Sequence, residues 1–215
     1  MPNHVTNILV VVGNEAQLKA VSLALLDKEG LVDFNNSIPI PKELEGTSSP
    51  ARIISATEYK EQEDKIARGE TVFSKGITQK ISQDLIEKYG YDNWYDWQLN
   101  TWGTKWNAYS QESLSENSFK FETAWATPSN FLLNFSAMFP EVTFEMKYAD
   151  EDMGYNVGEY HVKDGEIILM EQPEGGSEEA YKMALELQNG ADSWMLNDLF
   201  DDLEEIKNCF NQLKK

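Results

Sequence analysis

The sequence predicts an α+β protein, and three patterns along the chain support this class. Residues 8–12 form a continuously apolar run, which is typical of a central strand covered on both faces. Two later segments, 119–125 and 142–148, alternate apolar and polar residues with the period of half-buried strands. Between them, apolar residues at 131–139 recur at helical spacing. Strands and helices therefore alternate within one chain.

The first half of the predicted sheet lies near the N-terminus. A strand over residues 4–12 is followed by Asn14, a favourable N-cap, and Gln17 stands where it completes a capping box. Residues 34–41 are predicted to form the second strand at an edge of the sheet, because proline cannot donate a hydrogen bond to a neighbouring strand. The chain should leave the sheet at the two prolines of this segment.

The second half repeats the pattern. Residues 119–125 form the third predicted strand, and Thr127 is the predicted N-cap of a helix with Pro128 in its first position. Residues 142–148 form the fourth strand. The resulting order, β-α-β-β-α-β, is that of the ferredoxin-like fold.

Several segments are added to this unit. Residues 42–117 are predicted to be a helical, tryptophan-rich insertion, with helices near 56–68 and 77–89. After the fourth strand, residues 156–163 and 166–171 are predicted to form a β-hairpin, because an Asp-Gly pair joins them.

Two helices are predicted at the C-terminus. The first is capped by Ser177, and the second begins at about Ser193. We therefore expect a ferredoxin-like domain over residues 1–171 and an acidic C-terminal helical segment, 172–215, packed on it.

Composition favours a basic partner. The chain has 37 acidic and 18 basic residues, a net charge of −19. A field of this sign repels phosphate backbones and anionic membranes, so we expect neither duplex DNA binding nor membrane binding. The acidity is also compatible with a purely solubilising role. A single cysteine, no bilayer-length apolar stretch and no signal-peptide pattern predict a cytoplasmic location.

Motifs for metal, cofactor or catalytic chemistry are not found in the sequence. The two histidines and one cysteine lie too far apart in sequence for a zinc site. The acidic turn at residues 150–152 lacks the ligand spacing of a calcium loop. The sequence contains no nucleophile elbow, phosphate loop or dinucleotide fingerprint. No catalytic residue, metal or cofactor is therefore predicted.

A tryptophan cluster is the best candidate for a ligand site, since four of the six tryptophans lie between residues 94 and 106. Aromatic planes beside an ammonium group suit a nucleobase or a nucleotide. The alternative is that the rings form a small core that joins the insertion to the sheet. The candidate ligand-binding residues are Trp94, Trp97, Trp102, Thr104, Lys105 and Trp106.

Several segments together resemble the YubB-like family, which plasmids, phages and other bacterial mobile elements carry. The resemblance covers about residues 1–170, and its motifs lie at 1–7, 38–41, 94–97, 102–106, 121–128, 139–140 and 148–151. It implies a ferredoxin-like fold and a bacterial host, and it transfers no catalytic residue.

The leading functional hypothesis is a non-enzymatic phage or plasmid accessory protein that binds and inhibits a host component, in an anti-defence or DNA-mimic role. Its partner would be a basic host protein, such as a nucleic-acid-binding or defence protein. A nucleotide-binding or nucleotide-sequestering module is the alternative, and an enzyme using Lys105 with Asp96 is a third. The last helix is also compatible with a homodimer. Its acidic side carries the candidate partner-binding residues Asp198, Asp201, Asp202, Glu204 and Glu205.

Overall fold

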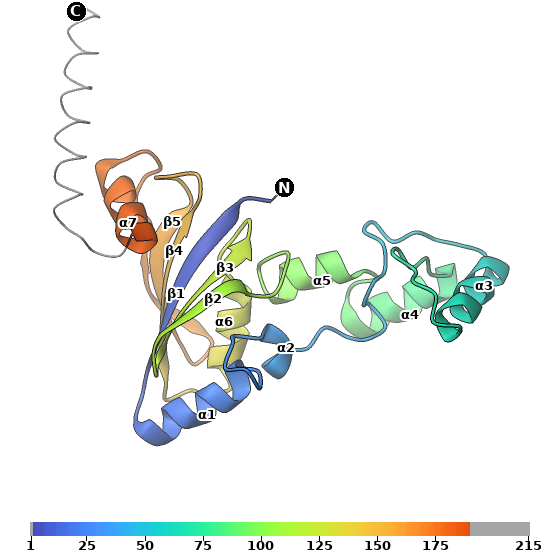
Figure 1. The fold of residues 1–215 in the computed structure, drawn as a ribbon, viewed down its shortest axis with the longest axis horizontal. Coiled ribbons are helices and arrows are strands. Elements are labelled where there is room, and N and C mark those ends of the chain that lie inside the picture. Colours follow the sequence, from blue (N-terminus) through green and yellow to red (C-terminus); the bar gives the residue numbers. More distant parts are fainter. Residues whose placement is uncertain (1, 190–215) are drawn as a thin grey trace, which may run out of the picture.

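The computed structural model describes residues 2–189 and contains one six-stranded antiparallel sheet (Figure 1). The strands lie in the order β2-β3-β1-β4-β5-β6. Their bounds are β1 His4–Val12, β2 Tyr109–Ser115, β3 Ser118–Ala124, β4 Thr143–Asp150, β5 Val157–Lys163 and β6 Glu166–Glu171. The helices are α1 Glu15–Leu25, α2 Phe34–Ser37, α3 Ala56–Ala67, α4 Gln79–Tyr89, α5 Trp94–Thr101, α6 Ser129–Ser136 and α7 Glu178–Asn189.

The ferredoxin-like arrangement is confirmed. β1, α1, β2, β3, α6 and β4 follow one another in the β-α-β-β-α-β order, and the four strands lie side by side as β2-β3-β1-β4. The predicted hairpin is present as β5 and β6, and it extends the sheet beyond β4. Its turn residues, Asp164 and Gly165, both have positive φ angles, as a two-residue hairpin turn requires.

The predicted second strand is wrong. Residues 34–37 form the short helix α2, whose N-cap Asp33 accepts a hydrogen bond from the backbone of Asn35 at 2.9 Å. Phe34 is fully buried, and the carbonyl of Ile38 accepts a hydrogen bond from the indole of Trp102 at 3.0 Å. This segment is therefore anchored to the core by side chains and lies outside the sheet.

The missing strand is β2, which lies inside the segment predicted to be an insertion. Six of its seven residues are polar or aromatic-polar, and its pairing with β3 contains two register shifts. An edge strand of this kind faces solvent and needs no apolar alternation, so its sequence resembles a loop. The interruption of the fold consequently lies between α1 and β2.

The main core lies between the sheet and helices α1, α2 and α6. Val5, Leu9 and Val11 of β1 point into it, and Phe34 stacks on Phe131 with ring centroids 4.3 Å apart. The Asn14 capping box at the start of α1 is present with both of its hydrogen bonds. By contrast, Thr127 does not cap α6, because its hydroxyl pairs with that of Tyr160 at 3.0 Å.

The opposite face of the sheet is covered only in part. α7 packs there on β4 and β5 through a small apolar cluster that includes Ala149, Val157 and Ala184. The predicted cap is confirmed, since the backbone of Ala180 donates to the hydroxyl of Ser177 at 3.1 Å. The predicted last helix, with its five candidate carboxylates, lies outside the described residues.

The insertion extends away from the sheet as α3 and α4, and α5 leads back to it (Figure 1). Both predicted helices are confirmed, and each has its own N-cap, Ser55 for α3 and Thr78 for α4. None of the helices described is long and apolar enough to cross a membrane.

Candidate functional site

The predicted tryptophan cluster divides into buried and exposed rings. Trp102 is fully buried, and Trp97, 8% exposed, packs edge-on against it with centroids 5.6 Å apart. Thr104 is also buried and donates its hydroxyl proton to the carbonyl of Ala124 at 2.9 Å. These three side chains connect α5 and the following loop to the sheet, and they do not reach a surface where a ligand could bind.

Lys105 and Trp106 do reach the surface, where Trp125 joins them. The ammonium nitrogen of Lys105 lies 4.9 Å from the ring centroid of Trp106 and 4.6 Å from that of Trp125. Both geometries are those of cation–π contacts. Trp106 is 39% exposed and Trp125 is 42% exposed. Two large aromatic side chains therefore flank one lysine at the protein surface.

Trp125 is a surface residue of the site, although the sequence pattern predicts that its side chain is buried. The alternation of Phe119, Phe121 and Thr123 along β3 predicts that Trp125 points into the core with them. Instead, its φ angle is +73°. This left-handed backbone reverses the direction of the side chain just after β3 ends, and the indole lies outside.

Aromatic contacts continue on both sides of this pair. Trp94 is half-buried and meets Tyr95 edge-on, and Tyr95 in turn meets Trp125 with centroids 6.2 Å apart. At the other end Trp106 meets Tyr109 with centroids 6.2 Å apart. We call Trp94, Tyr95, Trp125, Trp106 and Tyr109 the aromatic row.

A hollow with two carboxylates adjoins the Tyr109 end of this row. We call it the acidic hollow; its volume is about 440 Å³ and its lining residues are His4, Thr6, Glu122 and Glu151. Thr6 and Glu122 are direct neighbours across the β1–β3 pair. The hydroxyl of Tyr109 lies 2.8 Å from Nδ1 of His4, and this nitrogen lies 3.6 Å from the Glu122 carboxylate. The row and the hollow thus form one continuous surface.

The acidic turn at residues 150–152 has a structural role. The carboxylate of Asp150 accepts hydrogen bonds from the side chain of Asn3 and the backbone of Asp152, at 3.0 and 2.9 Å, and from the side chain of Asn156 at 2.9 Å. These bonds fix the loop that carries Glu151. Within residues 2–189, no three His, Cys, Asp or Glu side chains are grouped so that they could hold a metal ion.

The carboxylates of the acidic hollow affect the pKa of Tyr109. Burial, as the largest cause, and the charges of Glu122 and Glu151 together raise this pKa to about 12. The neutral phenol is therefore favoured in the folded state. The neutral phenol of Tyr109 therefore contributes to the free energy of unfolding. This contribution is fully present below the ordinary tyrosine pKa and is lost as the pH rises through about 12.

The double variant Glu122→Gln/Glu151→Gln is expected to lower the pKa of Tyr109, because it removes both negative charges and leaves the burial in place. A pH titration of ring-labelled tyrosine by NMR measures this pKa. Glu29→Gln/Glu141→Gln removes the same charge from exposed positions outside the hollow and should leave it unchanged. Equal pKa values in all three proteins would show that the carboxylates do not act on Tyr109.

The backbone of Trp125 gives a second prediction. A left-handed conformation costs a residue with a Cβ about 1–2 kcal/mol. Trp125→Gly should therefore be more stable than Trp125→Ala by about 1 kcal/mol, although both lose the indole. Urea unfolding of the two variants measures the difference. An alanine variant as stable as the glycine variant would mean that this backbone is unstrained.

Comparison with known proteins supports the fold. Residues 101–192 match the family model described as "Ferredoxin-like domain in Api92-like protein". The match is to a ferredoxin-like domain, and the matched range includes β2 to β6 with α6 and α7.

One solved structure with significant similarity is the protein api92 from Yersinia pseudotuberculosis, with 10% sequence identity and a TM-score of 0.43. The alignment covers 82% of this chain and all of that chain. A search of curated proteins finds no match.

Proposed function

We propose that this chain is a non-enzymatic accessory protein that binds and inhibits a basic host protein through the aromatic row and the acidic hollow. The observation that carries the proposal is the position of two exposed indoles beside a two-carboxylate hollow, on a chain of net charge −19. Tryptophan and tyrosine are enriched among the residues that dominate interface energies. Complementary charge supplies specificity and fast association.

A basic side chain of the partner fits this surface chemically. Its charged group would enter the acidic hollow between Glu122 and Glu151, and its apolar stem would lie along Tyr109 and Trp106. Contact with the indoles would exclude water from the ion pairs and strengthen them. This arrangement supports binding of a cationic protein rather than of a nucleic acid backbone.

The proposed setting is the cytoplasm of a bacterial host, with a phage or plasmid as the source of the gene. The resemblance to the YubB-like family supports that setting. An anti-defence or DNA-mimic role follows if the partner normally binds nucleic acid in a basic groove. The five carboxylates at 198–205 stay candidate partner contacts, and the homodimer stays a prediction.

Affinity capture from host lysate tests the proposal. The immobilised wild-type protein should retain a basic protein and release it as the salt concentration rises, because exposed ion pairs are screened. The variant Glu122→Gln/Glu151→Gln should retain much less of it, whereas the control Glu29→Gln/Glu141→Gln should capture it normally. Equal capture by all three proteins, or retention that ignores salt, would exclude this surface as the binding site.

A nucleotide-binding module is the second candidate, and one observation favours it. The ammonium group of Lys105 between two exposed indoles could contact a phosphate while a base stacks on Trp106 or Trp125. Nucleotides should then quench the tryptophan fluorescence, and Trp106→Ala should weaken the quenching without unfolding the protein. If no mono-, di- or cyclic nucleotide quenches the wild type, this candidate is rejected.

A further inference from the structure

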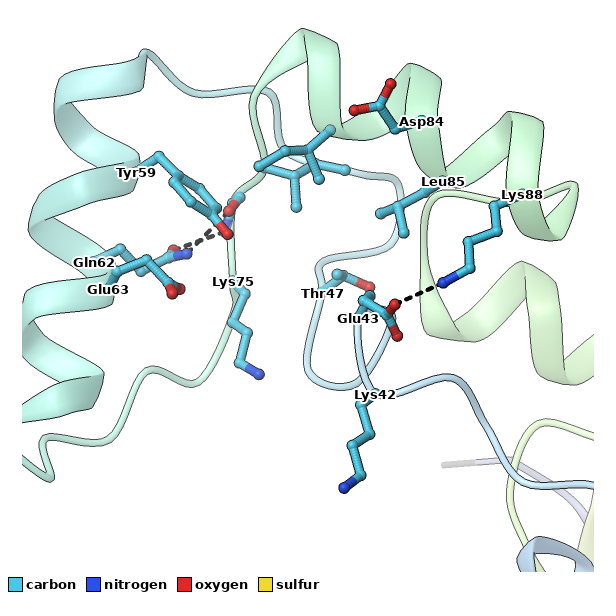
Figure 2. Close-up of a pocket in the computed structure, with 13 residues that line it drawn as sticks. Lys42, Glu43, Thr47, Tyr59, Gln62, Glu63, Lys75, Asp84, Leu85 and Lys88 are labelled. Carbon is cyan, nitrogen blue, oxygen red and sulfur yellow. Dashed lines mark hydrogen bonds and ion pairs between the residues drawn. The ribbon is translucent and has the colours of Figure 1, made fainter.

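The insertion contains a cavity of about 430 Å³ between α3 and α4 (Figure 2). None of its lining residues lines the acidic hollow. This volume is in the range of small-molecule pockets. Its apolar lining comes from Ile77, Ile81 and Leu85, together with the ring of Tyr59. The pocket therefore offers an apolar surface on which the body of a small ligand can lie.

Helix α3 has little other support. The one buried residue of its twelve is Gln62, a polar side chain. Its amide donates to the carbonyl of Gly76 at 3.0 Å and accepts from the backbone nitrogen of Gly76 at 2.8 Å. Helices in proteins are stabilised mainly by packing of an apolar face. The cavity occupies the place where α3 would otherwise pack on α4, and a bound ligand would supply the missing contact.

Three lysines line the pocket, and they differ in their partners. Lys88 forms an ion pair with Glu43, with a nitrogen–oxygen distance of 3.0 Å. Within the described part of the chain, Lys42 and Lys75 form no ion pair with a carboxylate, and Lys75 donates to the backbone carbonyl of Glu45 at 2.9 Å. Figure 2 shows the side chains of Lys42 and Lys75 extending toward the same edge of the pocket, away from Asp84.

We propose that this pocket binds a small organic carboxylate with an apolar body. The carboxylate lies between the ammonium groups of Lys42 and Lys75, and the body lies on Ile77, Ile81 and Leu85. Asp84 also lines the pocket, on the side away from these two lysines, and its charge repels a carboxylate from there, so it favours the lysine edge for the head group. The ligand closes α3 onto α4.

NMR titration of the labelled full-length protein tests this site with defined probes. Octanoate and phenylacetate are the carboxylates, and octanamide and phenylacetamide are their neutral controls. The carboxylates should shift the backbone amide signals of Gly76, Ile77 and Leu85 and increase the hydrogen-exchange protection of α3. The neutral amides should bind at least about tenfold more weakly, which corresponds to about 1.4 kcal/mol, the scale of a hydrogen bond to a charged group.

Variants locate the anion. Lys42→Met/Lys75→Met keeps the apolar stems and should abolish the preference for carboxylates, and Lys42→Met alone should reduce it. The control Lys19→Met/Lys28→Met removes two exposed lysines outside the pocket. This control should bind carboxylates with the same preference as the wild type. The proposal is overturned if neither carboxylate shifts the pocket signals at millimolar concentration, or if the amides bind equally well. Shifts confined to Trp106 and Trp125 would overturn it too.

Discussion

Replacing Trp102 with alanine is expected to destabilise the protein by about 3–5 kcal/mol, the usual cost of removing a large aromatic side chain from a core. The ring is fully buried, and it packs edge-on against Phe34 and Trp97, with centroids 5.6 Å away in both cases. The variant also leaves the carbonyl of Ile38 without its indole donor. The free energy of unfolding, measured in urea by circular dichroism, should show this loss.

Trp106→Ala is the matched control for the buried ring. Trp106 is 39% exposed, and its ring meets the ammonium group of Lys105 and the ring of Tyr109. Its removal should cost less than about 1 kcal/mol of stability, the scale of one exposed cation–π contact. Similar losses in the two variants would contradict the division of the cluster into buried and exposed rings.

The same Trp106→Ala variant is expected to weaken the affinity for the basic partner strongly. A central aromatic side chain of an interface contributes about 2–4 kcal/mol when truncated, equivalent to a reduction in affinity of about 30- to 1000-fold. The reason is that the indole shields the neighbouring ion pairs from water. Titration calorimetry with the captured basic partner measures the dissociation constant.

Two further variants complete that experiment. Leu23→Ala removes an apolar side chain that is 73% exposed on α1, on the opposite side of the sheet from the acidic hollow, and should leave the affinity unchanged. Glu122→Gln should reduce the dependence of the affinity on salt, because it removes one screened charge. If Leu23→Ala weakens binding as much as Trp106→Ala, the partner does not bind at the aromatic row.

The elements with strong local signals were predictable from the sequence. β1 has a dense run of β-branched residues, and the Asn14–Gln17 box and the Asp164–Gly165 turn each fix a local geometry. Such signals depend only on neighbours in the chain. They also gave the α+β class, but one member of the predicted β-α-β-β-α-β order, the second strand, was assigned to the wrong residues.

The second strand was predicted in the wrong place because its position depends on pairing with a distant strand, and not on its local sequence. The apolar residues of 34–41 anchor this segment to the core and do not form a strand, as the buried ring of Phe34 shows. β2 is an exposed edge strand, and its residues pair with β3 without a buried face of their own. A polar edge strand is recognisable only when its neighbour is known.

The candidate site was predicted in part. Trp106 and Lys105 lie at the surface as a ligand site requires, but composition could not show that Trp97 and Trp102 face inward. Trp125 was missed because its exposure depends on one positive φ angle, which no alternation pattern reveals. The acidic hollow was also missed, since Glu122 and Glu151 meet only through the pairing of β1 with β3 and β4.

Photo-crosslinking in host cells tests most directly whether the aromatic row is the binding surface. p-Benzoylphenylalanine in place of Trp106 should give, on illumination, one main adduct with a basic host protein. The same photoreactive residue in place of Leu23, exposed on α1, should give little of it. An adduct of equal yield from both positions, or one formed only from position 23, would contradict the account.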